Sequence, residues 1–213
     1  MQSLFEFLSL SDPNVRYVVL GSVLLGCCAA VVGTFTVLRK RALVGDAVAH
    51  SVLPGVCLAF LFAGSKNPFV LLIGAFLSGW LSLTVIDYIT RKTRIKEDAA
   101  IGLVLSVFFG AGILLLTAIQ QSGNAAQSGL DKFLFGKAAS LLFDDVLVFG
   151  GIAVLLLGLV WIFFKEFSLL TFDRDFAQAV GLPGRILELL LTTMTVLAVV
   201  GGIQAVGVVL MAA

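Results

Sequence analysis

Two residues in this sequence have the types and the spacing needed to bind a cation. Asp46 and His50, the only histidine, lie four positions apart in an apolar run that follows the three cations at 39–41. On a helix this spacing puts both side chains on one face, one turn apart. Counted from Arg41, Asp46 lies roughly 8 Å and His50 roughly 14 Å into a membrane, whose hydrocarbon half-thickness is about 15 Å. An ionisable pair at that depth is costly, which makes it a candidate functional site.

The two side chains suit a transition-metal ion in transit. Imidazole binds Zn²⁺ and Fe²⁺ well, and carboxylate also suits Mn²⁺. One helix supplies only two ligands, but a two-fold dimer with this face on its axis would supply two aspartates and two histidines. The residues alone leave open a purely structural Asp–His pair. Gly45 and Pro54-Gly55 flank the pair, so we expect backbone freedom or a kink beside it.

The composition indicates an integral membrane protein without enzyme chemistry. Of the 213 residues, 60% are hydrophobic and 13% are charged, whereas about 25% of the residues in a soluble domain are charged. A net charge of +1 gives no reason to expect nucleic acid as a partner. The sequence contains no phosphate-binding loop, no H-E-x-x-H motif and no credible Ser/His/Asp set, so we expect no catalytic residues and no stably bound cofactor.

Long apolar runs predict an all-α fold, a polytopic transmembrane bundle forming one domain over residues 1–213. The predicted spans cover about 17–38, 42–63, 69–89, 99–119, 146–164 and 186–200, with an incomplete seventh at 203–213. Gly201-Gly202 is expected to interrupt the chain before that seventh span. Residues 120–144 are expected to form a loop and a short interfacial or re-entrant helix. Because the sequence stops inside an apolar run, we expect it to be truncated.

The distribution of cations predicts the orientation of the chain. Ten of the fourteen lysines and arginines lie in the loops at 39–41, 91–98 and 165–185. The positive-inside rule therefore places these loops in the cytoplasm and the N-terminus outside. Asp87 and Glu188 lie near the cytoplasmic ends of their spans, and we expect them to reach the interface.

A short amphipathic helix is predicted at 173–183, between the last two long spans. Asp173 suits its N-cap, Gly181 its C-cap, and Pro183 stops it. Its apolar side consists of Phe176, Ala177, Val180 and Leu182. Such a helix either lies on the bilayer as a connection or is offered to a groove on a cytoplasmic partner.

Residues 38–55 resemble the membrane permeases of ABC importers for manganese, zinc and iron. The family pattern is a leucine and basic residues followed by G-D-x-x-x-H-x-x-L-P-G, which matches Gly45 to Gly55. Further resemblance lies at 97–102, Phe135-Gly136, 173–183 and 204–207, and it covers essentially all of 17–213.

The resemblance implies a homodimer of permeases in the cytoplasmic membrane of a bacterium, surrounded by lipid. It implies two ATP-binding subunits on the cytoplasmic side and a metal-binding protein on the outer side. It also implies that Asp46 and His50 line the path of a divalent metal (Mn, Zn or Fe), that 173–183 is the coupling helix, and that transport proceeds by alternating access. Such permeases have about eight spans, so one or two are expected to be missing here.

Other functions remain open on the sequence alone. A permease for metal chelates, siderophores or corrinoids would carry a large organic cargo, for which a bare Asp–His pair has no obvious use. A secondary transporter would need no ATP-binding partner and should show inverted internal repeats, but 17–90 and 99–165 show no convincing repeat. A non-transporting membrane scaffold would tolerate loss of Asp46 and His50.

Overall fold

The computed structural model describes residues 13–64, 67–121, 136 and 143–207, and every regular element within them is a helix. In chain order the helices are α2 (Pro13–Leu38), α3 (Val44–Ala63), α4 (Pro68–Lys92), α5 (Glu97–Gln121), α7 (Phe143–Ile162), α8 (Phe164–Phe172), α9 (Arg174–Ala179) and α10 (Gly184–Val206). Six helices in this part of the chain are long and apolar enough to cross a membrane. The predicted all-α transmembrane bundle is confirmed.

Local sequence signals set several helix ends. The side chain of Asn67 accepts a hydrogen bond from the backbone N–H of Phe69, with Pro68 at the first position of α4, a typical helix start. At the end of α3, Gly64 adopts a left-handed conformation with φ of 56°, which glycine reaches without steric cost. These two signals set the end of α3 and the start of α4.

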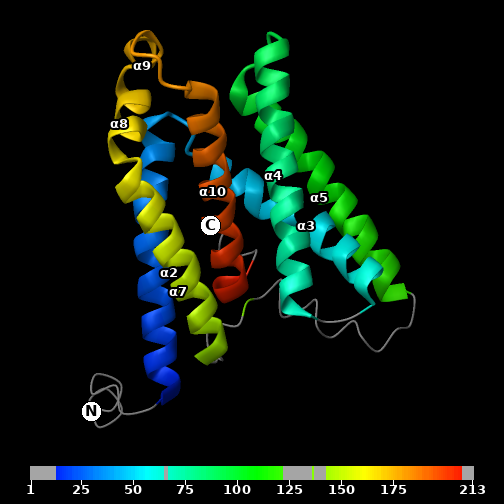
Figure 1. Cartoon of the computed structure of the whole chain (residues 1–213). Helices are drawn as coiled ribbons and strands as arrows, with labels where there is room; N and C mark the ends of the chain where they lie inside the picture. The colour runs from blue at the N-terminus through cyan, green and yellow to red at the C-terminus, as the bar shows by residue number, and fades with distance from the viewer. Residues whose placement is uncertain (1–12, 65–66, 122–135, 137–142, 208–213) are drawn as a thin grey trace, which may run out of the picture.

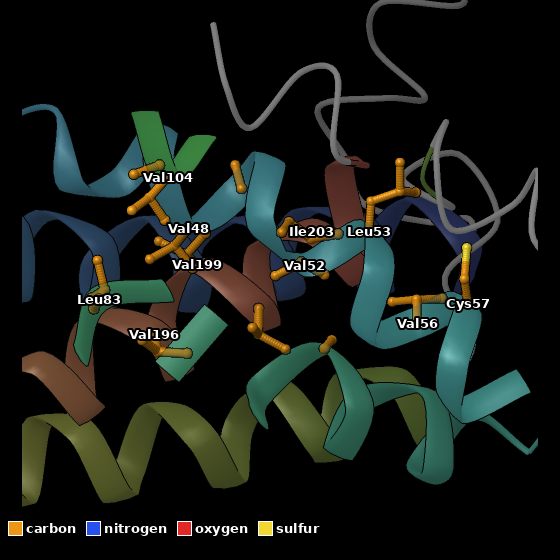
Figure 2. Close-up of a cluster of buried hydrophobic side chains, with 14 of the residues drawn as sticks. Val48, Val52, Leu53, Val56, Cys57, Leu83, Val104, Val196, Val199 and Ile203 are labelled. Atoms are coloured by element: carbon orange, nitrogen blue, oxygen red, sulfur yellow. The ribbon is translucent and has the colours of Figure 1, made fainter. Parts of the chain in front are cut away.

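The helices form two groups that meet at α10 (Figure 1). In one group, α3 packs against α4 and α5; in the other, α2 packs against α7 and α8. The larger hydrophobic cluster joins α3, α4 and α5 to Val196, Val199 and Ile203 of α10, as Figure 2 shows. A second cluster joins α2, α7, α8 and α9 to Leu187 and Met194 of the same helix. Helix α10 therefore packs against both groups of helices and joins them.

The predicted interruption at Gly201-Gly202 is wrong. Helix α10 continues through both glycines to Val206, so the described start of the expected seventh span, 203–206, belongs to α10. Gly201 packs closely, since a Cβ there would lie 3.3 Å from Cδ1 of Ile152. Small residues commonly make such contacts between membrane helices without breaking them. Residues 208–213 lie outside the described residues, as does most of the expected 120–144 loop and re-entrant helix.

The connection between α7 and α10 contains two short helices instead of one. Helix α8 was not predicted, and it buries Phe167 and Leu170 in the second cluster. Helix α9 is shorter than the predicted 173–183, because Gly181 adopts a φ of 86° after the last turn and Pro183 precedes α10. The chain must leave the helix at that glycine.

Candidate functional site

The Asp46–His50 pair lies on α3 with the geometry that its spacing predicts. Helix α3 begins at Val44, so Asp46 occupies its first turn and His50 the next. Oδ1 of Asp46 lies 3.3 Å from Nε2 of His50. The two side chains therefore share one face, and a small cation could contact both a carboxylate oxygen and an imidazole nitrogen there.

Contacts of the neighbouring Val48 locate the pair along the bundle. A Cβ at Gly79, near the middle of α4, would lie 3.1 Å from Cγ1 of Val48. The same Cβ would lie 3.2 Å from Cγ1 of Val196, near the middle of α10. Val48 falls between Asp46 and His50 in the sequence, so the pair lies about halfway along both neighbouring helices.

The surroundings of the pair leave it partly open and one ring nitrogen without a partner. The side chain of His50 is 27% exposed and that of Asp46 is 39% exposed. The imidazole ring meets Phe109 of α5 edge-on, with ring centroids 5.2 Å apart. Among the described residues, the buried Nδ1 of His50 has no hydrogen-bond partner. No group of three or more His, Cys, Asp or Glu in this part of the chain could hold a metal, so the described chain offers two ligands.

The backbone beside the pair is helical at Pro54 and closely packed at Gly55. Helix α3 remains helical through Pro54, although proline cannot donate a hydrogen bond to the carbonyl of His50. Gly55 makes close contact with α4, since a Cβ there would lie 2.1 Å from the carbonyl oxygen of Gly74. A Cβ at Gly45 would meet open space. The contact gives Gly55 a packing role, and its role as a hinge stays a prediction.

A second set of charges surrounds Glu188, at the end of the bundle predicted to be cytoplasmic. Glu188 is buried, with 6% of its surface exposed. Its carboxylate lies 3.0 Å from Nη2 of Arg39, 2.6 Å from Nη2 of Arg91 and 2.5 Å from Nη2 of Arg174. Arg39 directly follows α2, Arg91 lies in the last turn of α4, and Arg174 starts α9.

Arg41 forms a second group of ion pairs, close to the one around Glu188. Its guanidinium lies 2.7 Å from Asp87 and 2.8 Å from Glu97. Burial alone would lower the pKa of Arg41, but the Asp87 and Glu97 carboxylates outweigh it and raise that pKa. Burial lowers the pKa of Arg39, with Glu188 opposing the shift. These ion pairs bring the loops at 39–41, 91–98 and 165–185 to one end, which supports their assignment to one side of the membrane.

Sequence reasoning missed the role of Glu188 and Asp87. Both carboxylates lie at the end of the bundle predicted to be cytoplasmic, and the sequence did not predict that both would be paired with arginines there. The sequence did contain a signal for this pairing. Each carboxylate and several arginines are predicted to lie within a few residues of the same membrane surface. The partners themselves come from distant parts of the chain, and only helix packing identifies them.

The predicted coupling-helix residues divide into a buried side and an exposed side. The side chain of Asp173 accepts a hydrogen bond of 2.9 Å from the backbone N–H of Phe176, which confirms the N-cap. Ala177 is buried, whereas Phe176 and Val180 are exposed. The backbone N–H of Leu182 donates to the carbonyl of Ala177 across Gly181, which closes the C-terminal end. The exposed apolar residues are available for contact with another molecule.

Comparisons with known proteins find relatives whose names describe membrane proteins of metal transport systems. It is 55% identical over 207 residues to the manganese transport system membrane protein MntC of Bacillus subtilis, covering 97% of this chain and 48% of that protein. It is 48% identical over 203 residues to the zinc transport system membrane protein TroC of Treponema pallidum, covering 95% of this chain and 68% of that protein. The chain thus spans about half the length of the first relative and about two thirds of the second.

A solved structure agrees with these relatives. The structure described as PsaBC from Streptococcus pneumoniae in complex with Fab matches with a TM-score of 0.81 and 32% identity, covering 98% of this chain and 73% of that chain. The model of the ABC 3 transport family matches residues 11–213. The resemblance drawn from the sequence is therefore confirmed, and this chain, with its six apolar helices, is a multi-pass membrane protein that belongs to the ABC 3 transport family.

Proposed function

We propose that this chain is the permease part of an ATP-driven importer that moves a divalent transition-metal cation across the cytoplasmic membrane. The Asp46–His50 pair carries the proposal, because it lies halfway along the bundle on a partly open face. The names of the Bacillus and Treponema relatives, which refer to manganese and zinc, support this substrate class. Carboxylate and imidazole suit Mn²⁺, Zn²⁺ and Fe²⁺, so the ligands do not choose among them.

The open face favours a homodimer with the pair on its axis. An aspartate and a histidine left against lipid at this depth would be costly, so another protein surface must cover them. A second copy related by two-fold symmetry would cover the face and double the ligand set to two aspartates and two histidines. Such a set replaces part of the hydration shell of the ion, while its incomplete shell lets the ion leave.

Transport in this proposal proceeds by alternating access. An ATP-binding subunit on the cytoplasmic side binds the nucleotide, and this chain hydrolyses none itself. Helix α9 acts as the coupling helix, with the exposed Phe176 and Val180 contacting that subunit. A metal-binding protein on the opposite side delivers the ion. Movement of α9 in each permease copy then shifts the membrane helices, and the two copies rearrange around the central pair.

Metal accumulation in cells tests the proposal. Cells that produce the complete importer, with either the wild-type permease or the Asp46→Ala or His50→Ala variant, are compared for uptake of Mn²⁺, Zn²⁺ and Fe²⁺. The variants are compared at matched membrane levels. Asp98→Ala is the matched control, since Asp98 is an exposed aspartate at the start of α5. We expect the uptake of one metal to fall tenfold or more in both site variants. Unchanged uptake would show that the pair is structural.

The same cells separate the remaining alternatives. A permease for chelates would transport the chelated metal but not the free ion, and its transport would be insensitive to the two site variants. A secondary transporter would accumulate metal after removal of the ATP-binding subunit. We expect free-ion uptake that requires that subunit.

A further inference from the structure

Glu188 lies where three parts of the chain meet at one end of the bundle. Its buried carboxylate contacts Arg39 after α2, Arg91 in the last turn of α4 and Arg174 at the start of α9. Building on the proposed function, we propose that the Arg174–Glu188 ion pair is a releasable latch that holds the coupling helix α9 to the bundle. Arg174 is then a positioning residue for transport, and Glu188 is the carboxylate that it binds and releases.

The excess of arginines makes this contact releasable. A buried carboxylate with one cationic partner cannot lose it without leaving an unpaired buried charge. Glu188 keeps Arg39, whose side chain is only 16% exposed, and also Arg91 when Arg174 departs. The side chain of Arg174 is 55% exposed, so its charged group can move into water at little cost. One contact can therefore open and close while two remain.

Few other contacts hold α9 in place. Of its six residues, only Ala177 is buried, and the helix packs mainly on its neighbours α8 and α10. Apolar burial of this size gives weak anchoring. The Arg174–Glu188 ion pair therefore supplies a substantial part of what sets the position of α9 relative to α10. Phe176, exposed on the same helix, is the side chain through which a partner could move it.

The latch connects to the metal-site helix through adjacent ion pairs. Arg39 is two residues before Arg41, which binds Asp87 of α4 and Glu97 of α5. Arg41 is in turn five residues before Asp46, in the turn that leads into α3. A coupling network needs an element with two discrete arrangements. The bound and released positions of Arg174 provide them.

The test measures how much metal moves for each ATP hydrolysed. The importer, purified with its ATP-binding subunit and reconstituted in liposomes, is assayed for Mn²⁺, Zn²⁺ and Fe²⁺ uptake and for ATP hydrolysis in the same vesicles. Arg174→Gln removes the releasable partner and leaves Glu188 with Arg39 and Arg91, so the buried carboxylate stays paired. Arg174→Lys restores a cation. Arg185→Gln is the control, because Arg185 lies at the same end and forms no ion pair among the described residues.

We expect Arg174→Gln to lower the metal transported per ATP by about fivefold or more, with the ATP-binding subunit still bound in wild-type amount. Arg174→Lys should recover most of the ratio, and Arg185→Gln should leave it unchanged. A wild-type ratio in Arg174→Gln would refute the latch. Loss of the ATP-binding subunit from that variant would also refute it, since Arg174 would then be a docking residue. Failure of the wild-type importer to move any of the three metals would instead refute the proposed function.

Discussion

Replacing Gly55 by alanine should destabilise the bundle, because α3 and α4 touch backbone to backbone at this residue. The new Cβ would lie 2.1 Å from the carbonyl oxygen of Gly74 and 2.4 Å from Cβ of Ser78. Ordinary contact begins at 3.4 Å, so the shortfall is 3.4 minus 2.1, or 1.3 Å. The obstructing carbonyl belongs to a helix and cannot rotate away, so the two helices must separate. Overpacking of this kind costs about 1–3 kcal/mol.

The assay for this prediction is thermal unfolding of the purified protein in detergent. A chain of this size loses about 2–4 °C for each kcal/mol, so the melting temperature should fall by roughly 2–12 °C. Gly158→Ala in α7 is the matched control, because a Cβ there meets nothing within 4 Å. Alanine is the better helix former, so that control should melt at the wild-type temperature or above it. Equal melting of the two variants would refute the contact argument.

The same variants, assayed for melting in detergent and for metal uptake in cells, separate packing from the predicted hinge. If Gly55 serves only as a hinge, alanine would reduce metal uptake without lowering the melting temperature. If the contact with Gly74 dominates, melting falls first, and uptake falls because less folded protein remains. Gly74→Ala should then behave like Gly55→Ala, since a Cβ at Gly74 would lie 2.5 Å from the carbonyl oxygen of Gly55.

Two further predictions concern the ends of α9. Asp173→Ala removes the N-cap hydrogen bond and should destabilise the helix by about 1 kcal/mol. Faster amide hydrogen exchange over 174–179 would report this loss, and the exposed Gln178→Ala is the control; equal exchange in both variants would contradict the cap. Gly181→Ala forces alanine to a φ of 86°, at a cost of about 1–2 kcal/mol. Limited proteolysis should then cut near 181 faster than in the wild type, and unchanged cleavage would show that the turn tolerates a side chain.

The spans could be predicted from the sequence because hydropathy over about twenty residues decides membrane insertion almost alone. The boundaries at Gly64 and Asn67 follow from local signals that need no tertiary contact. The predicted interruption at Gly201-Gly202 was wrong because it depends on tertiary contacts, which local signals do not report. A glycine pair does not by itself break a membrane helix, and here Ile152 of α7 packs close to α10 at Gly201. That contact depends on how helices distant in the sequence are arranged.

The same distinction applies to the site. Asp46 and His50 lie four residues apart, so helix geometry alone brings them together. Glu188 and Arg39 lie 149 residues apart, and no local pattern joins them. Their pairing follows from α10 packing between the two helix groups. The role of Asp46 and His50 in metal transport stays a prediction until uptake is measured.

The late position of α10 in the chain has a consequence for how the protein is made. Helix α10 follows the other described helices, yet it contributes to all three hydrophobic clusters. Until it leaves the ribosome and enters the bilayer, Arg39 and Arg91 lack Glu188. During that interval these arginines are unneutralised, which is the state in which cations orient nascent helices toward the cytoplasm. We infer that they serve twice, first as topology signals during synthesis and then as ion-pair partners in the finished bundle.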